Sequence, residues 1–447
     1  MPHKRLRGAY VVLAAGRGPV LPVMHRRIGS PRYAPVSTSF DNAAQVLTPP
    51  EPNLPYLRTN RAGELRLDPG GITVDDDGRI GTLEPTSNAD VHVDAIGCAL
   101  LPGLVDCHTH LPFAGWRAQE YEAKVTGVPY EEIARAGGGI ASSARALKET
   151  ADDTVLTQAA ELAKEMLVHG TTTFECKSGY GLSRDGELRA LSLATRLGAA
   201  VPQQTTRTAL LAHAIPNSYT ADSWMDEVEA MVPEAAEYAT ALDIFVESIA
   251  FGLDHLDRMG ELAGANNLSL RAHVEQFSTM RSVPVALKHH ARSLDHLSAI
   301  HPDDIGPLGN SQTAAVLLPG AEFMGAEATA PARELIDAGA IVVLATDANP
   351  GTSPVLSLPL IVGLGVRRYG LSTREALLAV TLNAAYVLEL SSEVGTIEPG
   401  KRADLVLLDC PSEHVAYRLG HNPVAATFIA GEPAYVRPDA QWRITQR

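Results

Sequence analysis

No apolar run in the 447-residue chain approaches the roughly 18 residues of a membrane-spanning helix, so no membrane partner is expected. The four cysteines lie far apart and form no Cys-x-x-Cys pair, which is typical of reduced thiols in a cytoplasmic protein. Positive charge is also scarce, because 37 basic residues face 52 acidic residues and the net charge is −15. This balance disfavours nucleic acid and anionic membrane surfaces as partners.

What the chain does contain is enough apolar material for a large core, since 45% of its residues are hydrophobic. Length alone suggests about three domains, although one α/β barrel can absorb ~250 residues or more. Eight apolar, β-branched runs recur, most of them separated by Ala-, Leu- and Glu-rich stretches with helical spacing. The runs are 101–105, 171–176, 205–212, 241–246, 268–272, 291–294, 313–318 and 341–345. Eight strands alternating with helices predict a parallel sheet closed into a (β/α)8 TIM barrel.

Short strands with Gly and Pro turns are expected outside the barrel. Residues 72–83 have the pattern of a β-hairpin on an Asp-Gly turn, and further short runs follow at 405–408, 425–429 and 434–436. We expect these segments to pair in a small, β-sandwich-like domain built from both ends of the chain. The predicted parts are residues 1–98, the barrel at 99–385, and residues 386–447. Residues 1 to about 65 show no clear period, apart from a faint edge strand at 8–15.

Two histidines follow the first barrel run. His108 and His110 are separated by one residue, and side chains alternate along a strand, so both imidazoles are expected on one face. Two imidazoles at one strand end can chelate a metal ion. The alternative is a coincidental pair of structural histidines. That alternative is weakened by the polar residues that end the later runs.

Polar residues stand at seven of the eight predicted strand ends, where the active site of such a barrel is assembled. In chain order they are His108 and His110; Glu175, Lys177 and Tyr180; His213; Glu247; His273, Glu275 and Gln276; Asp295 and His296; and Asp347 and Asn349. A core role could explain one or two of them, but unpaired buried polar groups are costly. The set as a whole favours a catalytic site.

This pattern resembles the amidohydrolase superfamily of metal-dependent barrel hydrolases. The resemblance depends on His108-x-His110, His273, His296 and Asp347, which occur in that order and each at a strand end. The flanking segments agree with it. They are Pro102-Gly103 before the first motif and Gly395-Thr396-Ile397-Glu398-Pro399-Gly400-Lys401-x-Ala403-Asp404-Leu405 after the barrel.

A closer resemblance, over about residues 70 to 430, is to the imidazolonepropionase family within that superfamily. The motifs that carry it are His110-Leu111-x-Phe113-Ala114-Gly115-x-Arg117, Ala136-Gly137-Gly138-Gly139-Ile140, Lys177-Ser178-Gly179-Tyr180-Gly181-Leu182, Ala212-His213-Ala214-x-Pro216, Gln276-Phe277-Ser278, Leu317-Leu318-Pro319-Gly320 and Thr346-Asp347-x-Asn349-Pro350-Gly351. The resemblance implies metal-dependent hydrolysis of the cyclic amide C–N bond of 4-imidazolone-5-propanoate to N-formimidoyl-L-glutamate, in histidine degradation. It also suggests a homodimer.

The resemblance implies a metal site made by His108, His110, His273 and Asp347. Three imidazoles and one carboxylate, with an open position for water, suit a hydrolytic zinc site, and the expected ion is zinc or iron. Superfamily members with two metals use a bridging lysine on the fourth strand. This chain offers Glu247 there, so one ion per chain is expected.

Two of these strand-end residues are expected to act on the substrate. By resemblance, Asp347 takes a proton from the attacking water and passes it to the leaving nitrogen, and His296 polarises the scissile carbonyl. The alternatives are that Asp347 only coordinates the metal and that His296 only donates a supporting hydrogen bond.

A substrate with a carboxylate tail calls for a planar, forked cation, and Arg117, seven residues after His110, fits that need. A surface ion pair of Arg117 with Glu120 or Glu122 is the alternative. The other residues expected at the substrate are Tyr180 at the tail, His213 and the Glu275-Gln276 pair at the ring, and Asn349, Gly351 and Thr352 at the side where product forms. Within the pair, Gln276 is favoured and Glu275 stays possible as a catalytic group.

Two other functions remain in view at this point. Another cyclic amidohydrolase or a ring deaminase of the same superfamily would not need Arg117. A catalytically silent homologue that acts as a binding protein would be expected to have lost a metal ligand, and all four ligand positions are filled here.

Overall fold

The computed structural model describes residues 36–128, 130–325 and 328–446, and the edge strand expected at 8–15 lies outside them. Eight parallel strands form one sheet in which sequence neighbours are also spatial neighbours. They are β6 (Leu104–Asp106), β7 (Thr171–Lys177), β8 (Gln204–Ala212), β9 (Ala241–Val246), β10 (Ser269–Val274), β11 (Ser293–His296), β12 (Ala314–Leu317) and β13 (Ile341–Leu344). The first and last strands are joined beyond their ends by a parallel bridge between Thr109 and Ala348, which confirms the predicted barrel.

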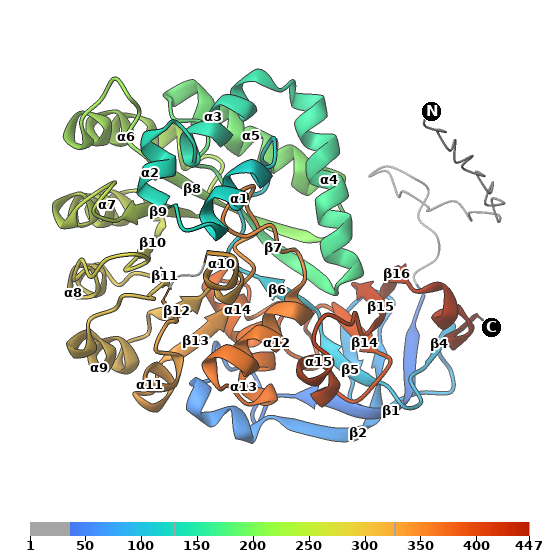
Figure 1. The fold of residues 1–447 in the computed structure, drawn as a ribbon. Helices are drawn as coiled ribbons and strands as arrows, with labels where there is room; N and C mark the ends of the chain where they lie inside the picture. The colour runs from blue at the N-terminus through green and yellow to red at the C-terminus, as the bar shows by residue number, and fades with distance from the viewer. Residues whose placement is uncertain (1–35, 129, 326–327, 447) are drawn as a thin grey trace, which may run out of the picture. The chain divides into compact units, whose positions relative to one another are not determined.

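Helices cover the outside of this sheet (Figure 1). They are α4 (Asp152–Val168), α5 (Arg184–Ala200), α6 (Ala221–Ala235), α7 (Leu253–Ala265), α8 (Val283–Lys288), α9 (Pro302–Asn310), α10 (Pro319–Gly325), α11 (Ala332–Asp337), α12 (Leu358–Tyr369), α13 (Thr373–Ala379) and α14 (Leu382–Val387). Every residue of β9 and β13 is buried, as near-continuous apolar strands require when both faces of a sheet are covered.

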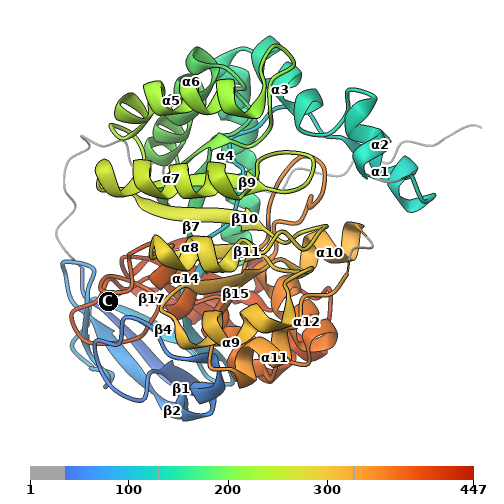
Figure 2. The ribbon, with the colours of Figure 1, turned by 90° about the vertical axis from the view of Figure 1, so that its left-hand side faces the viewer.

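A second, mixed sheet draws its strands from both ends of the chain, and Figures 1 and 2 show the blue and red strands side by side. Its members are β1 (Thr38–Thr48), β2 (Arg66–Val74), β3 (Ile80–Thr82), β4 (Val91–Asp94), β5 (Ala99–Pro102), β14 (Leu405–Leu408), β15 (Val424–Ile429), β16 (Glu432–Val436) and β17 (Ile444–Gln446). The expected hairpin is present as β2 and β3, and β14 pairs with β5. The composite β domain is therefore confirmed as a sheet from the two termini.

Strand β1 is the main feature of this sheet that the sequence pattern did not reveal. Its 11 residues lie at the centre, paired with β2 along one edge and with β4 and then β5 along the other. The register with β2 shifts twice, between Phe40 and Ala43 and between Ala43 and Val46, and Asn42 has a φ of 62°. Bulges interrupt the alternation of inward and outward side chains, which explains why no period of two is visible.

The run at 101–105 was expected to be one barrel strand, and this expectation is wrong. The chain leaves the mixed sheet after β5 and enters the barrel at β6, so the two sheets meet at Gly103. A Cβ at Gly103 would lie 2.1 Å from Thr172 Oγ1. The side chain of Thr172 therefore leaves room only for glycine at this crossing. The predicted domain limits at 98/99 and 385/386 stay predictions, although β5 itself lies with the mixed sheet.

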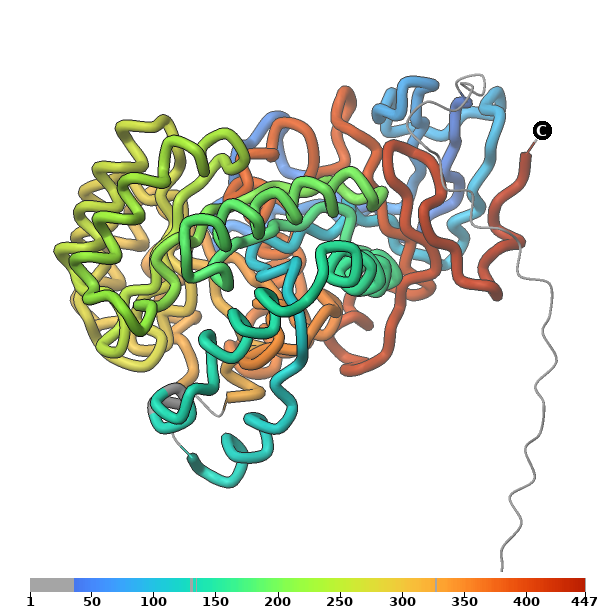
Figure 3. The backbone as a smooth tube through the Cα atoms, turned by 90° about the horizontal axis from the view of Figure 1, so that it is seen from above, coloured from blue at the N-terminus to red at the C-terminus, as the bar shows by residue number. Residues whose placement is uncertain are grey.

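Three helices follow the first barrel strand before α4 begins. They are α1 (Ala118–Val125), α2 (Tyr130–Arg135) and α3 (Ile140–Glu149), and Figures 2 and 3 show α1 and α2 extending away from the barrel wall. The remaining short elements are the 3₁₀ turns at Thr59–Glu64 and Pro438–Arg443 and helix α15 (Glu413–Tyr417). No helix among the described residues is both long and apolar enough to span a membrane.

Candidate metal centre and substrate cavity

The segment after β6 carries the His-x-His pair into the barrel. The backbone N–H of His110 donates to the carbonyl of Ala348 at 2.9 Å, which extends the strand-like pairing beyond Asp106. Cys107, between the strand and the histidines, packs in an apolar cluster with Val105. His108 and His110 both turn to the interior, where their ring centroids are 5.4 Å apart. The predicted alternation is confirmed.

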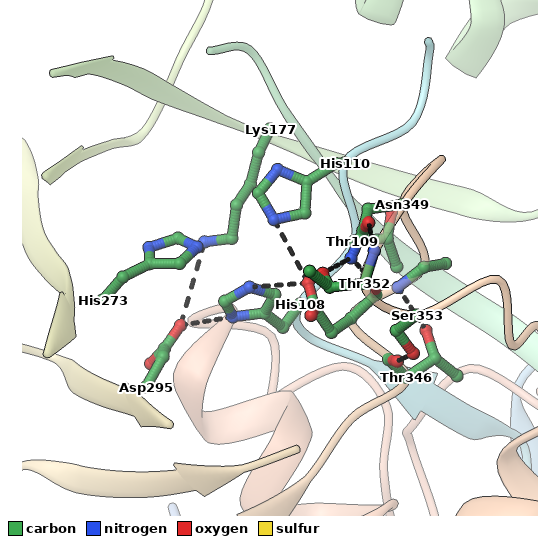
Figure 4. A network of polar contacts seen from close by, with 12 residues as sticks. His108, Thr109, His110, Lys177, His273, Asp295, Thr346, Asn349, Thr352 and Ser353 are labelled. Atoms are coloured by element: carbon green, nitrogen blue, oxygen red, sulfur yellow. Dashed lines mark hydrogen bonds and ion pairs between the residues drawn. The ribbon is translucent and has the colours of Figure 1, made fainter. Parts of the chain in front are cut away.

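Five of the predicted residues meet at the centre of the barrel. One possible ligand set joins His108, His110 and Asp347, and a second joins His108, His273 and His296; the ligand atoms of each set lie within 4.8 Å of one another. Asp347 Oδ1 is 3.5 Å from His108 Nε2 and 3.3 Å from His110 Nε2. Because both sets contain His108, they describe one site, and Figure 4 shows His110 and His273 on either side of it.

The backbone is left-handed where three strands deliver these side chains. Glu275, His296 and Asp347 follow or end β10, β11 and β13, and their φ angles are 54°, 81° and 52°. Such a conformation costs on the order of 1–3 kcal/mol for a residue other than glycine and persists only where the surroundings hold it.

The histidine rings are oriented for a cation. His108 Nδ1 lies 2.6 Å from Asp295 Oδ2, and His273 Nδ1 lies 3.0 Å from Asp243 Oδ1. A carboxylate only accepts, so each Nδ1 carries the proton and each Nε2 keeps its lone pair. Both Nε2 atoms are buried without a hydrogen-bond partner in the described part of the chain. This arrangement, in which a carboxylate fixes the histidine tautomer, is the one that metal-binding histidines usually have.

Burial favours the neutral form of three histidines of the cluster. Loss of solvent lowers the pKa of His108 and His110 well below its ordinary range, and it lowers the pKa of His296 to about 3. A neutral imidazole can bind a metal, whereas a protonated one cannot. Burial also raises the pKa of the Asp347 carboxyl. The residues of the cluster therefore fit a metal ion.

A cavity of about 410 Å³ opens above this cluster. Its lining residues are His110, Arg117, Ile140, Tyr180, His213, Phe245, His273, Gln276, Phe277, His296, Asp347, Asn349 and Thr352. His108 lies deeper, with no exposed surface. The cavity thus brings together predicted residues from seven separate strand ends and loops, at the face of the barrel where active sites form.

Arg117 is a buried cation with unused donors. It is 8% exposed, and its Nε and Nη1 atoms have no hydrogen-bond partner among the described residues. The nearest carboxylate is that of Glu120, 3.7 Å from Nε, so an ion pair exists but without a hydrogen bond. A Cβ on Gly351 would lie 1.7 Å from Nη2, so only glycine leaves room for the guanidinium in this position. Of the alternative, a surface ion pair, the pairing with Glu120 is present, but Arg117 is buried and not on the surface.

His213 has a defined tautomer. Its Nδ1 lies 2.9 Å from the carbonyl oxygen of Gly179, which can only accept, so Nδ1 carries the proton. Burial lowers its pKa well below the ordinary range. The neutral ring stacks on His110, with ring centroids 5.2 Å apart and planes at 18°. His213 Nε2 therefore offers a hydrogen-bond acceptor to a ligand in the cavity.

Within the Glu275-Gln276 pair, the structure separates the two side chains. The carboxylate of Glu275 accepts backbone hydrogen bonds from Met280 and Ser282, both at 2.7 Å, and Glu275 does not line the cavity. Gln276 does line it. The structure therefore favours Gln276 over Glu275 as the ring contact, because the oxygens of Glu275 hold the loop that follows β10.

Other predicted residues organise loops. The side chain of Asn349 binds the backbone of Gly351 and Thr352 at 2.8 and 2.7 Å, and its amide donates to the Asp347 carbonyl and to Thr352 Oγ1. Gly351 lies beside Arg117 and not on the main cavity. The carboxylate of Glu247 accepts from the backbone N–H of Phe277 and Ser278, so it shapes the loop that presents Gln276.

Sequence reasoning missed three apolar residues of the cavity, Ile140, Phe245 and Phe277. Ile140 and Phe277 stand inside motifs that were recognised, so their position next to Gly139 and Gln276 was a usable signal. Phe245 lies in the mostly apolar strand β9, where its residue type alone does not distinguish a side chain facing the cavity from a core residue.

Comparison with known proteins agrees with this site. The amidohydrolase family matches residues 99–434, so the chain belongs to that family. The imidazolonepropionase of Rubrobacter xylanophilus is 43% identical over 387 residues, which cover 84% of this chain and 93% of that protein. The imidazolonepropionase of Sphingopyxis alaskensis is 40% identical, with coverage of 82% and 94%. Within the amidohydrolases, the chain is thus a member of the imidazolonepropionase family.

Solved structures share the fold at low identity. An adenosine deaminase from Xanthomonas campestris with bound zinc superposes with a TM-score of 0.65 at 18% identity, covering 91% of this chain and 97% of that one. Guanine deaminase from C. acetobutylicum gives a TM-score of 0.64 at 14% identity, with coverage of 89% and 100%. At this identity the likeness concerns the fold alone.

Proposed function

We propose that the chain is an imidazolonepropionase, which hydrolyses the ring amide C–N bond of 4-imidazolone-5-propanoate to N-formimidoyl-L-glutamate, a step of histidine degradation. One observation carries the assignment to this substrate. A single cavity has a histidine and carboxylate cluster on its floor and the buried, unsatisfied guanidinium of Arg117 on its wall. A ligand that occupies both places needs a hydrolysable polar centre and an anionic tail.

The propanoate tail accounts for the donors of Arg117. A buried guanidinium without hydrogen bonds is costly, and a carboxylate that accepts two of its N–H groups removes that cost while giving a fixed orientation. Tyr180, buried on the same cavity, supports the tail. A tail held there places the ring between His213, Gln276 and the histidine cluster.

The ring is selected by its hydrogen-bonding pattern. His213 Nε2 accepts a hydrogen bond, so it pairs with a ring N–H and not with a carbonyl oxygen. Gln276 offers both an N–H donor and an oxygen acceptor and can meet the remaining ring nitrogen. Phe245 and Phe277 cover the faces of the cavity with apolar surface, which suits a flat ring.

Proton transfer is assigned to Asp347. An ion at the cluster would lower the pKa of its water from 15.7 to about 7 and polarise the carbonyl. Asp347, whose Oδ1 lies 3.5 and 3.3 Å from the Nε2 atoms of His108 and His110, takes the proton of the attacking water and delivers it to the ring nitrogen as the C–N bond breaks. His296, neutral through burial, donates a hydrogen bond to the carbonyl oxygen as negative charge develops there.

Three finer points belong to the same proposal. His108, His110, His273 and Asp347 hold one ion per chain, zinc or iron. The enzyme is a homodimer, and it works in the cytoplasm. The first point is supported by the two candidate ligand sets that share His108.

An absorbance assay tests the function. Purified enzyme is expected to consume 4-imidazolone-5-propanoate, to stop after treatment with a chelator, and to recover when zinc or iron is restored. The same assay is run with the ring compound that lacks the propanoate, which should be turned over poorly because Arg117 has no partner. Equal turnover of both compounds, or release of ammonia from purine or pyrimidine rings instead, would show a different amidohydrolase reaction.

A further inference from the structure

Five charged side chains are buried directly beneath the histidine cluster. Glu175 and Lys177 come from β7, Asp243 from β9, Arg271 from β10 and Asp295 from β11. Each is at most 1% exposed, and none lines the cavity. We call these five residues the floor network. Burying five charges costs desolvation free energy unless each charge is paired, so the network is expected to have a function that offsets this cost.

One arm of the floor network begins at His273. Asp243 accepts from His273 Nδ1 at 3.0 Å through one oxygen and from Lys177 Nζ at 2.7 Å through the other. Lys177 Nζ then reaches Glu175 Oε2 at 3.0 Å. The ammonium group therefore connects the carboxylate that holds a metal-binding histidine to a carboxylate that touches no histidine.

The other arm leads from Glu175 to His108. Arg271 binds Glu175 through Nη1 and Asp295 through Nη2, the latter at 2.9 Å. Asp295 lies 2.6 Å from His108 Nδ1, and Ser293 Oγ donates to its second oxygen at 2.6 Å. Lys177 and Asp295 also face each other at 3.9 Å, and Figure 4 shows both beside His108 and His273. The two arms meet at Glu175, so one continuous chain of ion pairs links the two histidines.

The charge of the floor network suits a divalent ion. Three carboxylates face two cations, which leaves one negative charge in excess. The carboxylate of Asp347 above adds a second. In a buried site of low dielectric, an uncompensated charge is costly, and an ion of charge +2 compensates both.

We propose that Glu175, Lys177 and Arg271 are positioning residues that act as one unit on the metal site. By holding Asp243 and Asp295 in place, they keep His273 and His108 turned with both Nε2 atoms toward a single ion. Glu175 joins the two arms, so its loss should loosen both histidines together. The role of the site as a metal centre rests on the proposed function, but the network is tested by metal binding and not by turnover.

The test uses the full chain, freed of metal, and titrates it with Co²⁺ in competition with a chromophoric chelator. Glu175→Gln keeps the shape of the side chain and removes its charge and one salt bridge to each cation. Loss of a partner beneath a metal ligand typically costs 10–100-fold in metal affinity, so Kd for Co²⁺ is expected to rise at least tenfold. The visible absorption of bound Co²⁺ should change as well, because the geometry of its histidine ligands relaxes.

The matched control is Glu398→Gln. Glu398 is also buried and paired with a lysine, Lys401, at 3.0 Å, but it lies outside the barrel. It should leave Kd within twofold of the unmodified chain. A folded Glu175→Gln protein whose Kd and Co²⁺ spectrum match those of the control would overturn the proposal.

Lys177→Met separates positioning from charge alone. Removing this cation leaves more negative charge under the site, so a purely electrostatic floor would bind Co²⁺ more tightly. Positioning predicts weaker binding, and tighter binding would refute it. If the charged variants do not fold, Ser293→Ala removes the donor to Asp295 and the acceptor of Arg271 Nε without changing any charge, and it should raise Kd about threefold. An unchanged Kd in this variant would also count against the proposal.

The outcome for the network is independent of the outcome for the substrate. If the unmodified protein binds Co²⁺ tightly but does not consume 4-imidazolone-5-propanoate, the proposed function fails and the network proposal stands. If the unmodified protein turns over the substrate and Glu175→Gln binds Co²⁺ as well as the control does, the proposed function stands and the network proposal fails.

Discussion

The floor and the wall of the cavity are built in opposite ways. On the floor, His108 and His273 stand at or just beyond strand ends, and their second nitrogens are occupied by carboxylates. On the wall, Arg117 lies directly before α1, and two of its nitrogens have no hydrogen-bond partner in the described part of the chain. The histidines of the floor are already oriented to bind a metal ion. The guanidinium of Arg117 on the wall, in contrast, has free donors that can bind an anion. Metal binding and substrate binding should therefore be separable by mutation.

The largest effect is expected at Asp347, where the two tasks meet. Asp347→Asn removes the acceptor for the proton of water while keeping the size of the side chain. General acid–base groups typically contribute 10²–10⁴-fold, so kcat at saturating metal should fall by about 10³-fold. Steady-state kinetics across a range of metal concentrations would check this. A kcat restored to the original value by added metal alone would show that Asp347 only coordinates.

Loss of the Arg117 guanidinium should weaken substrate binding and leave metal binding unchanged. Arg117→Ala removes charge-assisted hydrogen bonds to the tail worth about 2 kcal/mol, so KM for 4-imidazolone-5-propanoate should rise ~30-fold. The metal content of the variant should stay unchanged. Arg196→Ala is a suitable control, because Arg196 is half exposed on α5 and paired with Asp152 and Asp153. A variant that lost its metal would contradict the separation of wall and floor.

A smaller effect of the same kind is expected from Gly351→Ala. The new methyl group would collide with the guanidinium, and Arg117 would have to turn out of its position. We expect KM to rise about tenfold, less than on full removal, because the displaced side chain can still reach part of the tail. Gly306→Ala provides the control, since a Cβ there meets nothing within 4 Å. Unchanged kinetics in Gly351→Ala would mean that the tail binds elsewhere.

The smallest effect concerns pH and the metal-free protein. The pKa of His213 is lowered by burial, so the folded state stays neutral there while the unfolded state takes up a proton below the ordinary pKa of about 6.5. The free energy of unfolding should therefore fall as pH drops below about 6.5, by at most ~1.4 kcal/mol per pH unit for this group. His213→Gln should reduce that slope between pH 5 and 6 in denaturant titrations. An identical slope would show that His213 is protonated in the folded state.

The first two of the proposed metal ligands could be singled out from the sequence because their signal is local, whereas the full ligand set came from the family resemblance. His108 and His110 sit one residue apart at the end of an apolar run, and the period of a strand places both on one side. The later ligands follow equally clear strands. The fold was predictable for the same reason in the barrel, where all residues of a strand such as β13 are apolar and buried.

The wall and the mixed sheet were harder to predict because their signals are not local. Whether Glu275 or Gln276 faces the ligand depends on a left-handed turn after β10, which places the oxygens of Glu275 on the backbone of residues 280 and 282. Strand β1 is hidden by two register shifts, and Gly103 separates β5 from β6 within one apolar run. In each case, tertiary contacts override the pattern of neighbouring residues.

The most direct measurement is the metal content of the purified chain beside that of His108→Ala. His108 belongs to both ligand sets, so its removal dismantles the one place where segments far apart in sequence converge. The account predicts close to one zinc or iron ion per chain before the change, almost none after it, and the loss of hydrolysis in parallel. A His108→Ala protein that retains its ion and its full rate would contradict the account.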